Sequence, residues 1–150
     1  MLAVFLTTGL IGSAVTSGDI GVTTPASRTV TLTPTGSIPS AQQYLDPSDV
    51  LDFVLDMSSL LASGEQFSQV DLRVTATSAL QGFEVMEDAP YQAVPLDNGR
   101  IRIWVTVAIE KRDAQQWTKS ASCQIEVTAV TNSEPARTWQ RTAQIAVGQR

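Results

Sequence analysis

Apolar and polar residues alternate in short runs along most of the chain, with the period of two that is typical of half-buried β-strands. The longest run covers residues 101–110, and Asp-Asn-Gly at residues 97–99 forms a tight-turn signal before it. One face of this run consists of isoleucine and valine: Ile101, Ile103, Val105 and Val107. We therefore predict a long strand that faces a hydrophobic core.

The same pattern predicts further strands at 28–33, 50–57, 70–75, 83–86, 123–130 and 138–147. Residues 131–135, Thr-Asn-Ser-Glu-Pro, predict a turn that joins the last two strands as a hairpin. No stretch has a sustained helical period, and only residues 58–62 indicate one helical turn. Short strands at this spacing predict an all-β chain that folds as an immunoglobulin-like antiparallel β-sandwich.

The composition changes near residue 45. Of the first 45 residues, 22 are Ser, Thr, Gly or Pro, and only Asp19 and Arg28 carry charge. Such a segment buries too little apolar surface to fold alone. We predict an extended arm over residues 1–45, which contains one strand, and a sandwich domain over residues 46–150. The arm either pairs with a neighbouring subunit, by strand addition or wrapping, or folds back on its own domain.

Large apolar side chains in the arm, together with one tryptophan, are candidate protein-contact residues. Trp104 shares strand parity with Arg102 and Thr106, opposite the isoleucine and valine face, and an outward aromatic residue often marks a contact. Ordinary packing is the alternative for Trp104, and it is the favoured interpretation for Trp117 and Trp139. The candidates in the arm are Leu2, Val4, Phe5, Leu6, Leu10 and Ile11.

Charged residues make up only 17% of the chain, against about 25% in an average soluble domain. This low value suggests that part of the surface contacts other proteins. The net charge of −5 and the lack of a basic cluster argue against nucleic acid as a partner. The apolar run at the N-terminus is too short, and too interrupted by Thr and Gly, to span a membrane, so no membrane partner is expected.

The chain contains no histidine, which removes Ser–His and Cys–His nucleophile pairs and the usual zinc ligand. Its glycines are scattered and form no phosphate-binding loop. We therefore expect a protein that is not an enzyme, with no catalytic residue, no cofactor and no bound metal. The single cysteine, Cys123, shares parity with Ile125 and Val127 and is expected to be a buried thiol.

An acidic run between residues 46 and 56 is the one cluster that suggests a cation. Several carboxylates in a β-sandwich loop can bind calcium. However, Asp52 and Asp56 lie about 13 Å apart on a strand, at about 3.3 Å per residue, and the spacing lacks the glycine of an EF-hand loop. A solvated or salt-bridged strand face is the favoured interpretation.

Residues 46–65 resemble the opening of a family of small phage proteins, the fiber–tail adaptor proteins. The matching features are Asp46-Pro47-x-Asp49, Leu51-Asp52-Phe53, Asp56, Ser58 and the turn Gly64-Glu65. The far end is similar as well, because Arg137-Thr138 and Arg141-Thr142 precede a closing strand at residues 143–147. The resemblance covers about residues 46–150. Residues 83–120 are longer than the usual form, and the first 45 residues have no counterpart in the short versions.

The resemblance implies a structural component of a bacteriophage virion, located at the neck or tail. Such a protein would join portal, neck, tail or fiber components through protein contacts, and a homo-oligomeric ring is expected. A capsid decoration (cement) protein is an alternative that the sequence does not separate from this role. A second alternative is an extracellular calcium-dependent adhesion domain that uses the acidic run.

Overall fold

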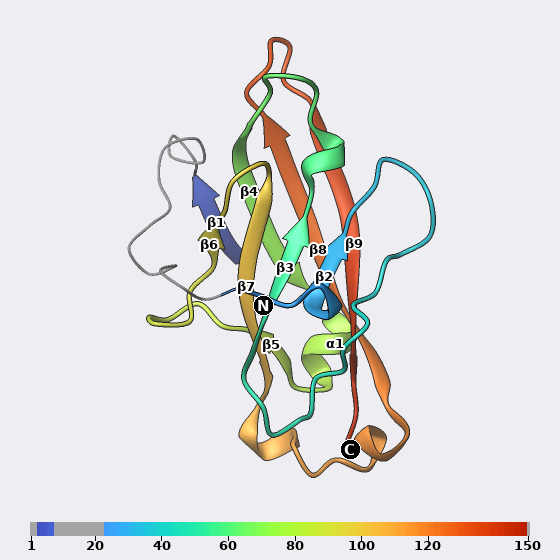
Figure 1. Cartoon of the computed structure of the whole chain (residues 1–150). Helices are drawn as coiled ribbons and strands as arrows, with labels where there is room; N and C mark the ends of the chain where they lie inside the picture. The colour runs from blue at the N-terminus through green and yellow to red at the C-terminus, as the bar shows by residue number, and fades with distance from the viewer. Residues whose placement is uncertain (1–2, 8–22, 150) are drawn as a thin grey trace.

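Two β-sheets form a sandwich in a computed structural model, which describes residues 3–7 and 23–149 (Figure 1). One sheet has the order β1-β4-β8-β9, from Ala3–Thr7, Phe67–Val74, Ala121–Thr131 and Thr138–Val147. The other has the order β2-β3-β7-β5, from Thr29–Thr31, Leu51–Asp56, Arg100–Val107 and Phe83–Val85, and β6 (Val94–Pro95) also pairs with β7. The predicted all-β sandwich is confirmed, whereas its immunoglobulin-like subtype stays a prediction.

The alternating runs of the sequence correspond to strands. All seven predicted strands are present, β9 with the predicted bounds and the others with shifted ends, and β8 and β9 form the expected hairpin. The arm holds two strands, β1 and β2, where one was expected. The longest run is shorter than expected, because β7 ends at Val107. There the Ala108 N–H donates to the Gly82 carbonyl at 2.8 Å, and the chain turns into the 3-10 helix η4 (Ile109–Lys111).

Short helical segments connect the strands. The helical turn expected near residue 60 is η3 (Ser58–Leu60), and η2 (Ala26–Arg28) leads into β2. Helix α1 (Ala76–Leu80) and η5 (Gln115–Lys119) had no signal in the sequence pattern. A five-residue helix is too short to show a 3.6-residue period, which explains why the pattern did not predict α1.

The arm residues before β3 cross from one sheet to the other. After β2, residues 39–45 run along the outer edge of β9, with bridges from Ser40 to Gln144 and from Leu45 to Val147. The chain then returns to the other sheet as β3, so β2 pairs with β3 in parallel. The described pairings are therefore antiparallel except for β2–β3 and for the two bridges from Ser40 and Leu45 to β9, which are parallel.

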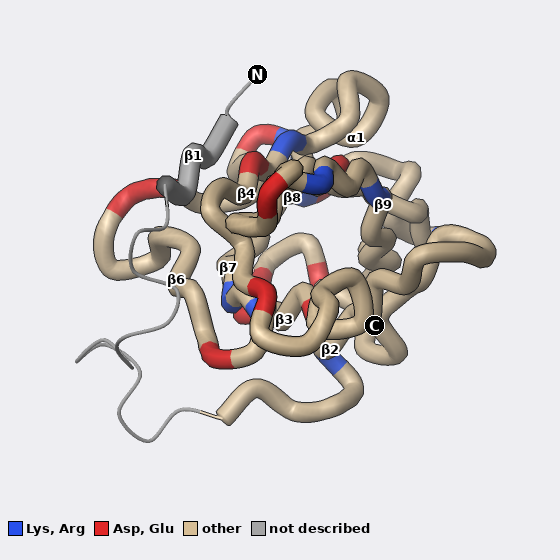
Figure 2. The backbone as a smooth tube through the Cα atoms, turned by 90° about the horizontal axis from the view of Figure 1, so that it is seen from above, with Lys and Arg blue, Asp and Glu red and all other residues tan. Residues whose placement is uncertain are grey.

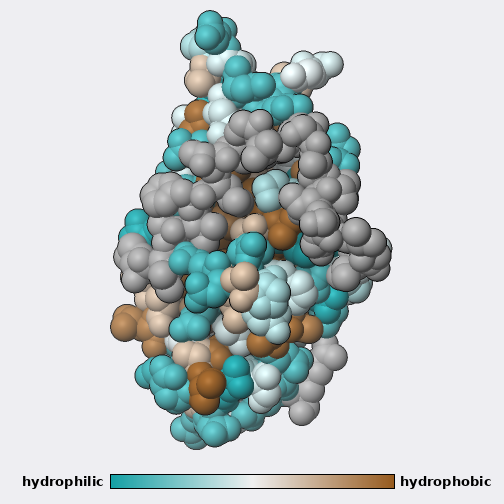
Figure 3. Space-filling view, turned by 90° about the vertical axis from the view of Figure 1, so that its left-hand side faces the viewer, coloured by the Kyte–Doolittle hydropathy of each residue, from teal (hydrophilic) through white to brown (hydrophobic). Residues whose placement is uncertain are grey.

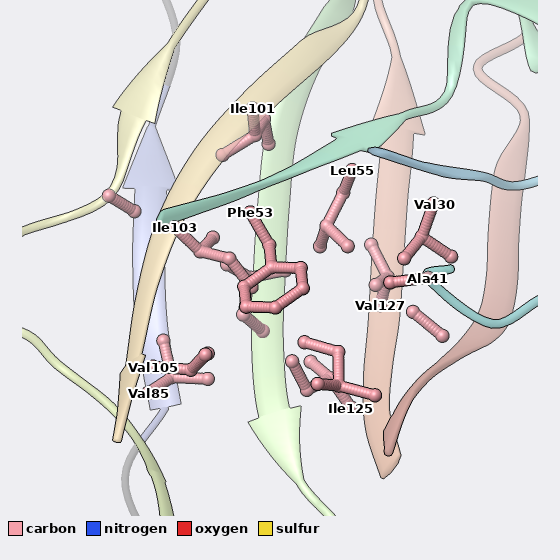
Figure 4. Packing of buried hydrophobic residues seen from close by; sticks show 14 of the residues in the cluster. Val30, Ala41, Phe53, Leu55, Val85, Ile101, Ile103, Val105, Ile125 and Val127 are labelled. Carbon is pink, nitrogen blue, oxygen red and sulfur yellow. The ribbon is translucent and has the colours of Figure 1, made fainter. Parts of the chain in front are cut away.

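The core lies between the two sheets, where inward side chains from both meet (Figure 4). Phe53 and Ile103 from one sheet and Ile125 and Val127 from the other are all buried. Burying a side chain of this size contributes about 1.5–3 kcal/mol each. The arm adds four further buried residues to the same cluster: Val30, Leu32, Ala41 and Leu45. A truncation at residue 44 would therefore remove part of the core as well as the arm.

Trp117 belongs to η5 and packs in the core cluster between the sheets. Its ring is fully buried, and its Nε1–H donates to the Lys111 carbonyl at 2.7 Å. The packing interpretation of Trp117 is confirmed. Cys123 is buried as expected, and burial raises the pKa of its thiol to about 12.

Candidate assembly interface

The described parts of the arm lie at the edges of the two sheets. β1 is one edge of its sheet, and β2 is an edge strand of the other. Residues 39–45 pair with the free side of β9, and four backbone hydrogen bonds of 2.9–3.1 Å connect them to residues 144–148. Unpaired strand edges promote association with other chains. The arm therefore controls which edges of the sandwich are open to a partner.

β1 pairs with β4 in an antiparallel register. Val4 is opposite Leu72 and Leu6 is opposite Val70, and both of these β4 side chains are buried. Phe5 is opposite Asp71. Three of the predicted contact residues thus belong to an edge strand of the sandwich. The other three from the arm, Leu2, Leu10 and Ile11, lie outside the described residues.

A buried ion cluster fixes the start of the described arm to β3 and β7. Arg28 Nη2 lies 2.9 Å from Asp52 Oδ1, and Arg102 Nε lies 3.5 Å from Asp52 Oδ2. Thr24 Oγ1 donates to Asp52 Oδ2 and accepts from Arg102 Nε at 3.1 Å. Burial lowers the pKa of the Arg102 guanidinium from its ordinary value. For Asp52, the salt-bridged interpretation of the acidic run is confirmed, with the carboxylate shielded from water.

Trp104 is on the outer face of β7, as its parity predicts, but this face is largely covered. Arg102 and Thr106 beside it are buried, and the Thr106 hydroxyl donates to the Asp49 carbonyl at 2.9 Å. Trp104 itself is half-buried and meets Tyr91 edge to face, with ring centroids 5.4 Å apart. Only part of the Trp104 ring therefore remains for a contact with another molecule, and its role there stays a prediction.

The largest exposed apolar side chains at the end near α1 were missed by the sequence pattern. Leu80 at the end of α1 is 79% exposed and Ile109 in η4 is 77% exposed. The hydrogen bond between Gly82 and Ala108 brings these two segments to the same end of the molecule. Ile109 has the parity of the inward face of β7, so only the early end of the strand explains its exposure. In the part of the surface described in Figure 3, apolar residues form separate spots among hydrophilic ones.

Trp139 lies between two arginines at the opposite end. The guanidinium carbons of Arg137 and Arg141 lie 5.5 and 4.9 Å from its ring centroid. Arg137 also forms an ion pair with Glu65, and this contact lowers the pKa of the Glu65 carboxyl to about 2. Arg141 donates to the Thr33 carbonyl at 2.9 Å. These contacts give Trp139 a packing role, as expected.

A pocket of about 240 Å³ lies beside Arg141, between residues 32–39 and residues 140–142. Arg141 is the only charged residue in its lining, and backbone carbonyls of Thr33 and Pro34 accept hydrogen bonds from that side chain. The guanidinium is therefore already occupied by the protein. The pocket adds no charged group that is free to bind a ligand.

In Figure 2, Lys and Arg positions and Asp and Glu positions are both spread over several parts of the described backbone. Within residues 3–7 and 23–149 there is no group of three or more His, Cys, Asp or Glu that could hold a metal ion. The same part of the chain has no helix that is long and apolar enough to cross a membrane.

Comparison with protein-family models, with curated proteins and with solved structures found no match to this chain.

Proposed function

We propose that this protein is a structural subunit of a bacteriophage virion, at the neck or tail, where it joins neighbouring virion components through protein contacts. The observation that carries the proposal is the ion pair between Glu65 and Arg137. Glu65 ends the opening motif of the resemblance to fiber–tail adaptor proteins, and Arg137 begins its closing motif. The two halves are 72 residues apart and meet in space, so together they are more specific than either half alone.

The other acidic residues of the opening motif have structural partners. Asp46 Oδ1 accepts from the Ser48 N–H at 2.9 Å, and Asp56 Oδ1 accepts from the Ser58 N–H at 3.0 Å. Asp52 contacts two arginines. The acidic residues of the motif thus stabilise turns and hold the arm against the sheet, which suits a structural subunit. In the described residues these carboxylates do not come together as a group of three that could hold a cation, which weakens the adhesion-domain alternative.

The edge position of the arm supports the assembly role. β1 gives the sandwich an edge strand whose outer side can pair with another protein. The low charge of the chain is in keeping with a surface that is partly covered in the assembled state. Subunits of a ring use one patch against a different patch on the neighbour, and an arm with its acceptor edge is such a pair of patches.

Immunogold labelling of phage particles with antibody to this protein tests the proposal. Label at the neck or tail is the expected result. Label over the whole head would replace the proposal with the capsid decoration role, and unlabelled particles would reject both. Antibody that has been absorbed with the purified protein is the control, because it must abolish any specific label.

A thermal melt with and without calcium tests the adhesion-domain alternative. A ligand that binds only the folded state raises the Tm, so a calcium-dependent domain would gain several degrees at millimolar calcium. We expect no shift, and magnesium at the same concentration is the control for ionic strength.

A further inference from the structure

We propose that β1 of one copy pairs with β4 of a second copy, so that neighbouring subunits exchange the first strand of the arm. The inference names the partner at the candidate assembly interface. It rests on the proposed function in one respect, because the expected ring holds copies side by side.

The arm has a fixed part and a part that pairs at one edge only. Residues from 24 onward are fixed to their own chain by the Asp52 ion cluster and by buried side chains such as Leu32 and Leu45. β1, in contrast, is an edge strand whose sheet neighbour is β4 alone among the described strands. Residues from 24 onward therefore stay packed on their own chain. Their contacts do not determine whether β1 pairs with β4 of the same chain or of another chain.

The connection between these parts is long enough to reach a neighbour. Fifteen residues, 8–22, separate Thr7 from Thr23. Fully extended, they span up to about 50 Å. This is more than twice the radius of gyration of about 15 Å expected for a domain of this length. Because the β1–β4 contacts are the same within one chain or between two, the choice depends mainly on the tether and on how close the neighbour is.

The acceptor edge needs a strand from some chain. Without β1, the eight-residue strand β4 would be an open edge beside buried Val70 and Leu72. The register places apolar positions of β1, Val4 and Leu6, opposite these two residues. A second copy supplies the same strand in the same register. In a closed ring, exchange would therefore pair every β4 with the β1 of a neighbouring copy.

Asp71 lies at the β1–β4 contact and has an unsatisfied carboxylate oxygen there. One of its carboxylate oxygens is buried without a hydrogen-bond partner, and Asp71 is directly opposite Phe5. A buried acceptor without a partner costs free energy and weakens the docking of β1. The cost is the same whether β1 comes from the chain itself or from a second copy, so it makes β1 easier to release from β4 without favouring either donor.

Cysteine pairing between two separately made variants tests the exchange. Thr7 and Gln69 are opposite each other in the register, so the cysteines introduced by Thr7→Cys in one chain and Gln69→Cys in another can pair with each other only between chains, and the native Cys123 is buried. The two full-length variants are mixed, refolded together at high concentration, oxidised and run on a non-reducing gel. The expected result is a disulfide dimer in the mixture that neither variant forms alone.

A double variant and a second register pair provide the controls. The chain that carries both Thr7→Cys and Gln69→Cys reports pairing within one molecule. Thr128→Cys and Gln140→Cys, opposite each other in the β8–β9 hairpin, should give no dimer when they are mixed as separate chains. If the Thr7 and Gln69 mixture stays monomeric while the double variant closes a disulfide within the chain, the exchange is rejected.

The outcome is separable from that of the labelling experiment. Labelled particles together with a monomeric mixture would reject the exchange and leave the virion role. Dimers together with unlabelled particles would support the exchange and reject the virion role.

Discussion

Arg28 and Asp52 meet where the arm joins β3, with Arg28 Nη2 2.9 Å from Asp52 Oδ1. The two side chains come from segments with different composition, one rich in Ser, Thr, Gly and Pro and the other a regular strand. Arg102 of β7 adds a second guanidinium to the same carboxylate. One aspartate thus holds the arm against the sheet, and its removal affects both segments.

Asp52→Asn should destabilise the protein by about 3–5 kcal/mol, because it removes the carboxylate that the buried Arg102 and the half-buried Arg28 share. Urea unfolding measures this change through a lower midpoint at unchanged slope. Asp49→Asn is the matched control, since Asp49 is exposed and the change should stay within about 0.5 kcal/mol. Equal midpoints for the two variants would contradict a role of Asp52 as the anchor.

Glu65 should contribute to stability only above strongly acidic pH. Its pKa in the folded protein is lowered from 4.5 to about 2, chiefly by the hydrogen bond from Arg137. A lowered pKa means that the contribution is complete above pH 4.5 and is lost as the pH falls from 4.5 to about 2. As the pH falls from 4.5 to about 2, the Glu65→Gln variant should therefore lose less stability than the wild type.

The measurement is urea unfolding of the wild type and of Glu65→Gln at several pH values between 2 and 6. Glu134→Gln, at an exposed glutamate, should leave the acid dependence unchanged. A Glu65→Gln profile parallel to that of the wild type would mean that the ion pair with Arg137 contributes nothing to stability.

Cys123 should resist alkylation in the folded protein. Burial raises the pKa of its thiol to about 12, so almost no thiolate exists at pH 8, and the thiol is also shielded from reagents. Mass spectrometry after iodoacetamide treatment should find Cys123 unmodified in buffer and alkylated in urea. Ser122→Cys places a second thiol at an exposed neighbouring position, and only this one should react in the folded state.

Gly82→Ala should destabilise the protein more than Gly64→Ala. Both glycines have positive φ, +92° and +76°, which costs an alanine about 1–2 kcal/mol. A Cβ at Gly82 would also come within 2.6 Å of the Lys111 side chain, whereas nothing lies within 4 Å at Gly64. The clash adds about 1–3 kcal/mol, and thermal or urea unfolding of the two variants should show the difference.

Alternation in the sequence was enough to predict the sandwich and its strands, because a sheet with one buried face requires a period of two. The pattern could not predict the limits of that face. Arg102 and Thr106 have outward parity but are buried, since residues from the arm and the segment before β3 cover them. Ile109 has inward parity but is exposed, since the strand stops two residues earlier.

The sequence pattern could not predict contacts between segments that are far apart in the chain. Asp52 and Asp56 look equivalent along their strand, yet only Asp52 meets Arg28 and Arg102. The pairing of residues 39–45 with β9 had no signal either, because these residues form bridges and not a regular strand. Such contacts depend on how the arm passes between the sheets, which local periodicity does not encode.

Because residues 39–45 pair with the outer side of β9, the sheet β1-β4-β8-β9 can be extended on one side only. Residues 39–45 occupy the far side of β9, so among the described strands of this sheet only the β1 side can be extended. A row of molecules linked through β1 and β4 would then have two unlike ends, one with an unused donor and one with an unused acceptor. Only a circle removes both ends, so the number of copies would be limited by curvature and not by the supply of subunits.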